Sequence, residues 1–176
     1  MRHNRILKPN ATYHVTVRAN RKEMILYCDM MRALFFNTIK RAKRRYRFQV
    51  HNFCIMGNHI HLIIHPEQNE SLSRIMQWIL SVFAMAWNRK HLVSGHVWGE
   101  RFFSKVLDSI RDFIKTFIYV IQNPINAQIV GRADEWEFGG LWHFKEGNCE
   151  ILEGLPGLTL GMYHLYYRLL IINADT

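Results

Sequence analysis

The sequence predicts an α+β protein: a ferredoxin-like antiparallel sheet with helices on its faces. Three observations support this expectation. Segments with strand-forming and helix-forming patterns follow one another in the order strand, helix, two strands, helix, strand. Gly57-Asn58, between the second and third strands, is typical of a tight hairpin. The chain has 176 residues, 49% of them apolar, and no Pro- or Ser-rich linker, so it can bury one ordinary core.

The first half of the chain contains three of the predicted strands and one helix. Residues 12–19 alternate apolar and polar side chains, as a half-buried strand does. A helix is expected from about 29 to 46, where Asp29 is placed to cap the start and a basic cluster lies near the end. Strands follow at 48–56 and 59–65.

The second half is expected to add two helices and one strand. Ser71 opens a helix, and residues 102–107 form a short fourth strand. A further helix starts at Ser109, which has an acidic residue three positions later as in a capping box, and Pro124 is expected to stop it. The last apolar run, 162–172, fits either a strand or a helix.

Composition indicates the compartment. The three cysteines lie far apart, without Cys-x-x-Cys spacing, which favours a reducing environment. The basic start lacks the apolar core of a signal peptide. The longest apolar stretch, 75–87, is well below the roughly 20 residues that cross a bilayer. We therefore expect a cytoplasmic protein and no membrane partner.

Positive charge is concentrated in the N-terminal part of the chain. Residues 1–50 contain 13 Lys or Arg and 2 acidic residues, whereas the remainder contains 10 and 12. The densest segment, 40–47, suits the phosphate backbone of a nucleic acid, although a solvated helix end is an equal alternative. The candidate phosphate contacts there are Arg41, Lys43, Arg44 and Arg45.

The most informative short motif is His59-Ile-His61. On a strand, residues i and i+2 point to the same face, so the two imidazoles project side by side and can bind one metal ion. His65 shares that face but lies about 20 Å along the strand, too far to join them. Two ligands make an incomplete site, and such a pair taken alone is more often a polar strand edge than a metal site.

A late helix could complete the site. Tyr119 and Asn123 are four residues apart and therefore share one helix face, with Lys115 one turn earlier on the same face. Such a helix can bring a phenol and an amide oxygen to one point, and Lys115 could hold a phosphate or favour the phenolate. Each residue also has an ordinary structural explanation, as a packing tyrosine, a helix-end asparagine or an exposed lysine.

Several motifs together resemble a known family. The stretches MGNHIHLII, WGERFFSKV and YVIQNPINA, with a Tyr-His-Val-Thr-x-Arg strand before them, resemble the single-tyrosine HUH transposases, in particular the bacterial REP-associated tyrosine transposases. The resemblance spans about residues 9–130. We therefore expect one transposase domain over 1–176, with its core at about 9–130 and an extension at 131–176.

The resemblance implies roles for the site residues. His59 and His61 are then metal ligands, Asn123 is the third ligand with Gln122 as second choice, and Tyr119 is the nucleophile. The implied metal is Mg²⁺ or Mn²⁺, which an amide oxygen and phosphate oxygens favour, and no organic cofactor is expected. The implied reaction is nicking and strand transfer on single-stranded DNA hairpins or REP-like sequences, through a 5′-phosphotyrosine intermediate.

Three other interpretations remain open at this stage. A replication-initiator HUH nuclease would use the same chemistry, but the usual Lys that follows its tyrosine is absent after Tyr119. A non-catalytic nucleic-acid-binding relative would keep only the basic surface. A two-histidine phosphoesterase would need a second His-x-Ser/Thr, for which His14-Val-Thr16 is the sole candidate. The sequence fits a monomer or a homodimer.

Overall fold

A computed structural model describes residues 8–153 and 158–174. At its centre is a four-stranded antiparallel sheet with the strand order β2-β3-β1-β4. This order and the predicted alternation of strands and helices confirm the ferredoxin-like α+β fold. The strands are β1 (Tyr13–Arg18), β2 (Phe48–Ile55), β3 (His59–Pro66) and β4 (Phe103–Val106).

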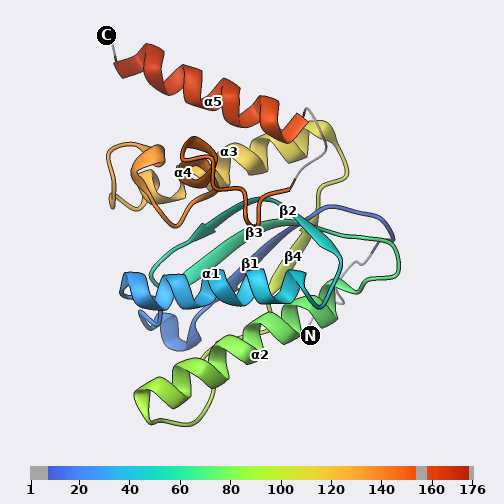
Figure 1. Ribbon diagram of the computed structural model, residues 1–176, viewed down its shortest axis with the longest axis vertical. Helices are drawn as coiled ribbons and strands as arrows, with labels where there is room; N and C mark the ends of the chain where they lie inside the picture. The colour runs from blue at the N-terminus through green and yellow to red at the C-terminus, as the bar shows by residue number, and fades with distance from the viewer. Residues whose placement is uncertain (1–7, 154–157, 175–176) are drawn as a thin grey trace.

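Helices lie on both faces of the sheet (Figure 1). One face is covered by α1 (Asp29–Lys43) and α2 (Leu72–His91). The other carries α3 (Ile110–Asn126), α4 (Gly140–Lys145) and α5 (Leu158–Ala174). Two short 3-10 helices are η1 (Asn20–Lys22) and η2 (Ala133–Glu135). No helix in the described ranges combines the length and apolar character that a membrane span needs.

The two faces of the sheet belong to two different hydrophobic cores. Alternate residues of the central strands, such as Val15 of β1 and Leu62 of β3, are buried against α1 and α2. On the opposite face, Ile63 is buried with Phe117 of α3. Because α3 packs over β2 and β3, the same side of β1 and β4 keeps exposed side chains.

The helix starts follow the predicted caps in two of three cases. The Ser71 hydroxyl accepts the Arg74 amide at the start of α2, and the Ser109 hydroxyl accepts the Asp112 amide at the start of α3. The expectation that Asp29 caps α1 is wrong: Asp29 is the first helical residue and pairs with Arg32 at 2.7 Å.

The predicted end of α3 at Pro124 is also wrong, because the helix continues to Asn126. Pro124 has no N–H, so the helix passes this position without the hydrogen bond that such a group would make. The turn is closed instead by the Ala127 amide, which donates to the Asn123 carbonyl at 3.0 Å. The open choice for the last apolar run is decided in favour of a helix, α5.

The C-terminal part of the chain packs against β2 and α3. Bridges between Cys54 and Gly139 and between Val50 and Leu152 cover the β2 edge of the sheet. The buried hydroxyl of Tyr163 donates to the His51 carbonyl at 3.1 Å and lies 2.9 Å from Asn52 Oδ1. β4, the other edge strand, has no strand partner on its outer side in the described chain.

Candidate active site

His59 and His61 lie at the start of β3, on the face that carries α3. Their ring centroids are 5.1 Å apart with nearly perpendicular planes. The intervening Ile60 points into the opposite core and is fully buried, which holds the strand in the register that turns both imidazoles to this face.

α3 brings a phenol and an amide to the histidines. The Tyr119 ring lies edge-on to the His61 ring, with centroids 5.4 Å apart, and remains 48% exposed. Asn123, one turn later, is only 8% exposed, and its Oδ1 lies 3.5 Å from His59 Nε2. The structure thus brings together the four side chains that the sequence singled out, within one chain.

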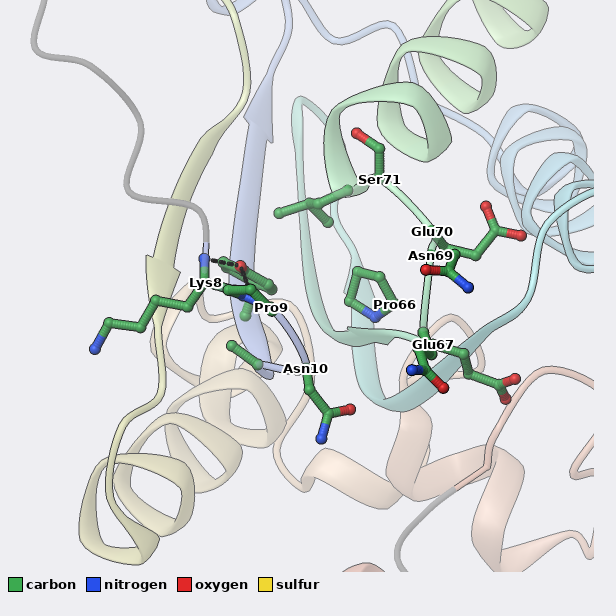
Figure 2. Close-up of a pocket in the computed structure, with 12 residues that line it drawn as sticks. Lys8, Pro9, Asn10, Pro66, Glu67, Asn69, Glu70 and Ser71 are labelled. Carbon is green, nitrogen blue, oxygen red and sulfur yellow. Dashed lines mark hydrogen bonds between the residues drawn. The ribbon is translucent and has the colours of Figure 1, made fainter.

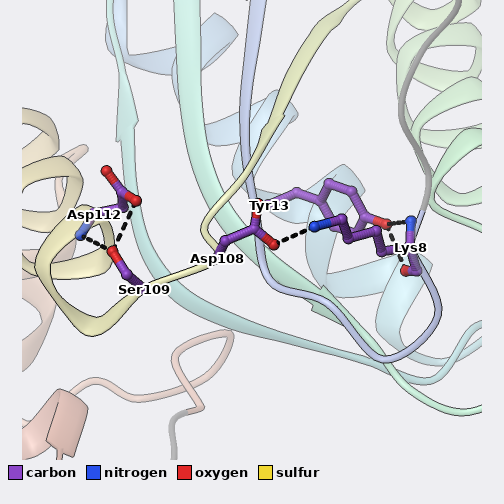
Figure 3. A network of polar contacts seen from close by, with 5 residues as sticks. All are labelled: Lys8, Tyr13, Asp108, Ser109 and Asp112. Atoms are coloured by element: carbon purple, nitrogen blue, oxygen red, sulfur yellow. Dashed lines mark hydrogen bonds and ion pairs between the residues drawn. The ribbon is translucent and has the colours of Figure 1, made fainter.

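The first turn of α3, one end of the helix away from Tyr119 and Asn123, is held by its own polar contacts. Figure 3 shows that the Ser109 hydroxyl, besides accepting the Asp112 amide, donates to the Asp112 carboxylate at 2.8 Å. Asp108, one residue earlier, pairs with Lys8 at 2.6 Å, and the Lys8 backbone is hydrogen-bonded to the Tyr13 hydroxyl. The first turn of α3 is therefore tied to the start of β1.

Two hydrogen-bond acceptors face each other at His59: its own Nε2 and Oδ1 of Asn123. Asn58 Oδ1, which can only accept, lies 2.8 Å from His59 Nδ1, so Nδ1 carries the proton and Nε2 presents its lone pair. The Asn123 amide nitrogen donates to the Tyr119 carbonyl at 3.0 Å, which turns Oδ1 toward His59. Two acceptors at 3.5 Å repel each other unless a proton or a cation lies between them.

His61 is oriented by β1. Its Nδ1 lies 3.0 Å from His14 Nε2 and 3.2 Å from Thr16 Oγ1, both on the neighbouring strand. Its Nε2 is buried and has no hydrogen-bond partner at acceptable geometry among the described residues. If Nδ1–H donates to β1, the lone pair of Nε2 is left for a ligand. The sequence did not single out this role for His14 and Thr16, although Thr16 and His61 are direct partners in the sheet.

Burial keeps the imidazoles neutral. It lowers the pKa of His61 to about 3 as the largest effect, and the nearby side chains of His14, His59 and Arg18 act in the same direction. Burial also lowers the pKa of His59, against a smaller opposite effect of Asn123. Neutral imidazole is the form that binds metal ions.

These contacts fit the divalent cation that the family resemblance implies. Lone pairs of two imidazoles and one amide oxygen are present, and the His61 nitrogen is a buried acceptor that lacks a hydrogen-bond partner in the described structure. Such mixed nitrogen and oxygen donors suit Mn²⁺, and Mg²⁺ if phosphate oxygens and water complete its shell.

The other candidates lie farther away. Burial raises the pKa of the Tyr166 phenol of α5, and Gln122, the second choice for the amide ligand, lies close enough to oppose that effect. Asn123 is the amide beside the histidines. Lys115 is exposed one turn before Tyr119. His65 contacts Thr12 at 3.2 Å near the other end of β3, in line with its exclusion from the site.

The basic cluster lies on the opposite side of the sheet from the histidine pair. The cluster runs from the end of α1 to Phe48, the first residue of β2. Phe48 pairs with Pro66 at the far end of β3, about 20 Å from His59. Lys43 forms an ion pair with Glu153 at 2.8 Å. The other candidates, Arg41, Arg44 and Arg45, are exposed.

A cavity of about 780 Å³ lies at the Pro66 end of the sheet, between the Lys8 segment and the turn before α2. Figure 2 shows Glu67 and Glu70 at its rim. Both its acidic rim and its position at the opposite end of β3 from His59 separate it from the histidine site.

The fold and the site define a class of protein: an antiparallel α+β domain in which a helix places a phenol over a cluster of imidazoles. The family model described as "Transposase IS200 like" matches residues 8–123, about two thirds of the chain. The chain therefore belongs to the IS200-like transposase family. No curated protein matches it in sequence.

One solved structure supports this fold. The REP-associated tyrosine transposase bound to a REP hairpin aligns with a TM-score of 0.73 at 18% identity, over 88% of this chain and 92% of that one. A crystal structure described as a transposase from Deinococcus radiodurans R1 has a TM-score of 0.48 at 14% identity, over 68% of this chain and 96% of that one. At 18% identity, the first comparison confirms the fold.

Proposed function

We propose that the protein nicks and rejoins single-stranded DNA, with Tyr119 as the nucleophile. The observation that carries the proposal is the half-exposed phenol of Tyr119 beside inward-facing acceptors of His59, His61 and Asn123. Membership of a transposase family supports the same reaction class.

In the proposed reaction, Tyr119 Oη attacks the scissile phosphorus and the bond from phosphorus to the 3′ oxygen breaks. A new bond joins the tyrosine oxygen to the 5′ phosphate, and the phenol proton ends on the released 3′-hydroxyl. Because this linkage is itself a phosphodiester, the 3′-hydroxyl of a second strand can reverse the step without ATP.

His59, His61 and Asn123 would hold the divalent cation, Mg²⁺ or Mn²⁺. When bound there, the cation would polarise the phosphate oxygens as a Lewis acid. The chain's own contribution is to keep both imidazoles neutral by burial and to orient them through Asn58 and His14.

The proposed substrate is a DNA hairpin with a single-stranded flank. The solved transposase of the same fold was bound to a REP hairpin, and exposed arginines near the end of α1 are available for phosphate contacts. Hairpins from the DNA that flanks the gene are therefore the first substrates to test.

Tyr119→Phe is the decisive change. The variant is expected to form no protein-linked DNA band on a denaturing gel, because only the phenol oxygen is lost, and to bind labelled hairpin DNA within about twofold of the original protein. The matched control is Tyr27→Phe, because Tyr27 is similarly exposed at 54% but precedes α1.

The same assay tests the metal. Chelation should abolish the covalent band, and Mg²⁺ or Mn²⁺ should restore it. A band that persists in Tyr119→Phe refutes the assignment of the nucleophile. Binding without any band, with either metal and cognate hairpin, would favour the non-catalytic alternative.

A further inference from the structure

An open groove follows the seam between α1 and α2, which lie side by side on the face of the sheet opposite α3 (Figure 1). Arg41, near the end of α1, lies 5.9 Å over the Trp78 ring near the start of α2. Tyr27, just before α1, contacts His91 at the end of α2, with ring centroids 6.3 Å apart. The two helices are therefore antiparallel. The groove between them has a volume of about 550 Å³.

We propose that this groove, here called the α1–α2 groove, binds a helical segment of another protein, one with an apolar face flanked by acidic residues. The inference is independent of the proposed reaction, because the groove and the pair of Tyr119 and His59 lie on opposite faces of the sheet. A partner held in the groove leaves Tyr119 exposed to a substrate.

The floor of the α1–α2 groove is apolar. Val82, Met85 and Ala86 are spaced i, i+3 and i+4 and therefore share one face of α2, and Leu34 of α1 lines the other side. Met85 is 65% exposed, and the other three side chains are only half-buried. An exposed methionine beside half-buried aliphatic side chains is typical of grooves that bind amphipathic helices, because its flexible side chain adapts to the partner.

Cations lie at both ends of the α1–α2 groove. Arg41 lies at the end near Trp78, and Arg89 and Lys90 lie at the other end. Trp78 and Arg89 are eleven residues apart on α2, or about 16 Å along the helix. Among the described residues, no carboxylate lies within ion-pair distance of these three cations. An acidic helix of about three turns would reach both ends, and this charge pattern selects against a basic one.

Two other occupants fit the groove less well. A second copy of the chain would have to present an exposed apolar helix face, and the described candidates are flanked by cations. Ile114 of α3 precedes Lys115, and Leu165 of α5 lies three residues before Arg168. Paired DNA would contact the basic ends, but its phosphates gain nothing from the apolar floor between them. An acidic amphipathic helix uses both the floor and the ends.

The probes are three fluorescein-labelled synthetic peptides of about 20 residues, long enough to span the groove as a helix. The first has leucines at the spacing i, i+3, i+4 and i+7 with Glu on both sides. The second has Lys in place of Glu, and the third has the composition of the first with its leucines out of helical period. Only the first is expected to bind in fluorescence anisotropy, with a dissociation constant on the order of 10 μM.

Variants locate the bound peptide. Met85→Glu is expected to weaken binding of the acidic peptide about tenfold, because it places a carboxylate on the apolar floor. The matched control is Leu165→Glu, since Leu165 is similarly exposed at 62% but lies on α5. Arg89→Gln should weaken binding about threefold, whereas Arg111→Gln, at an exposed arginine of α3, should leave it unchanged. In methyl NMR spectra, the Met85 signal should shift on binding and the Leu165 signals should not.

The proposal is overturned if the acidic peptide does not bind, if the basic peptide binds equally well, or if Met85→Glu and Leu165→Glu bind the acidic peptide alike. It is also overturned if the original protein is a dimer on gel filtration and Met85→Glu alone makes it a monomer, since a second copy would then occupy the groove. A loss of hairpin affinity in Met85→Glu that Leu165→Glu lacks would assign the groove to DNA instead. None of these measurements depends on adduct formation, so a failure of Tyr119 as nucleophile would be recognised separately.

Discussion

At the scale of single residues, the two nitrogens of His61 have different surroundings. Nδ1 contacts His14 and Thr16, whereas Nε2 is buried without a hydrogen-bond partner among the described residues. The ring orientation, and with it the direction of the Nε2 lone pair, therefore depends on β1. Residues that hold the second ring nitrogen of a metal-binding histidine commonly contribute to metal affinity.

His14→Ala is accordingly expected to weaken Mn²⁺ binding about tenfold, measured by titration calorimetry or by electron paramagnetic resonance. His14→Gln, which can still accept the Nδ1–H bond, should lose less. His96, an exposed histidine before β4, is the matched control for replacement by Ala. Unchanged affinity in His14→Ala would show that β1 does not orient His61 for metal.

A second histidine bears on stability. His51 of β2 is 2% exposed, and burial lowers its pKa to about 4, with additional effects of His65 and Lys43 in the same direction. Because the unfolded chain protonates His51 near pH 6.5, the unfolded state binds more protons between these two values. The contribution to stability is therefore present above about pH 6.5 and is lost as the pH falls toward 4.

We expect the free energy of unfolding to decrease by on the order of 2 kcal/mol from this group between pH 7.5 and pH 4.5. His51→Phe should remove that part of the pH dependence, measured by urea unfolding at both pH values. His96→Phe should retain it. An identical pH dependence in His51→Phe and the original chain would contradict the prediction.

At the scale of elements, α3 both contributes to stability through its N-cap and positions two of the candidate site residues. Its N-cap at Ser109 lies ten residues before Tyr119, and helical spacing then places Tyr119 and Asn123 on the same face. Pro124 lies inside the helix, so the backbone remains helical at Asn123 and its side chain stays at the histidines.

Ser109→Ala is expected to cost about 1 kcal/mol of unfolding free energy, because the Asp112 amide loses its acceptor. Thermal or urea unfolding measures the loss, and Ser94→Ala in the exposed loop after α2 is the control. A change below the error of the measurement would show that the first turn is held by the Lys8–Asp108 contact alone.

At the scale of the whole molecule, the basic cluster of residues 40–47 and the histidine site lie on opposite faces of the sheet. A substrate that contacts both must extend over about 20 Å. The basic residues near the end of α1 also differ in their partners. Lys40 and Lys43 form ion pairs with Glu150 and Glu153 of the C-terminal part. Those two acids hold the C-terminal segment on α1.

Replacement of Arg41, Arg44 and Arg45 together by Gln is expected to make the salt slope for hairpin binding shallower by about 2.7, because three phosphate contacts on the paired stem are removed. Lys43→Gln should change the slope less and lower stability more, since its partner Glu153 is left without the pair. Fluorescence anisotropy at several salt concentrations and urea unfolding separate the two effects. An unchanged slope in the triple variant would exclude these arginines from the DNA interface.

The sequence by itself determined the features that depend on local periodicity: the order of strands and helices, the caps at Ser71 and Ser109, and the shared face of His59 and His61. It also predicted that Tyr119 and Asn123 lie on one helix face, because helical spacing is local. Tertiary structure decided which distant residues meet. The register between β1 and β3 put His14 and Thr16 against His61, and the packing of α3 over β2 and β3 left Phe103 exposed. Such contacts join segments more than forty residues apart, and they depend on the burial of whole faces that no short stretch of sequence contains.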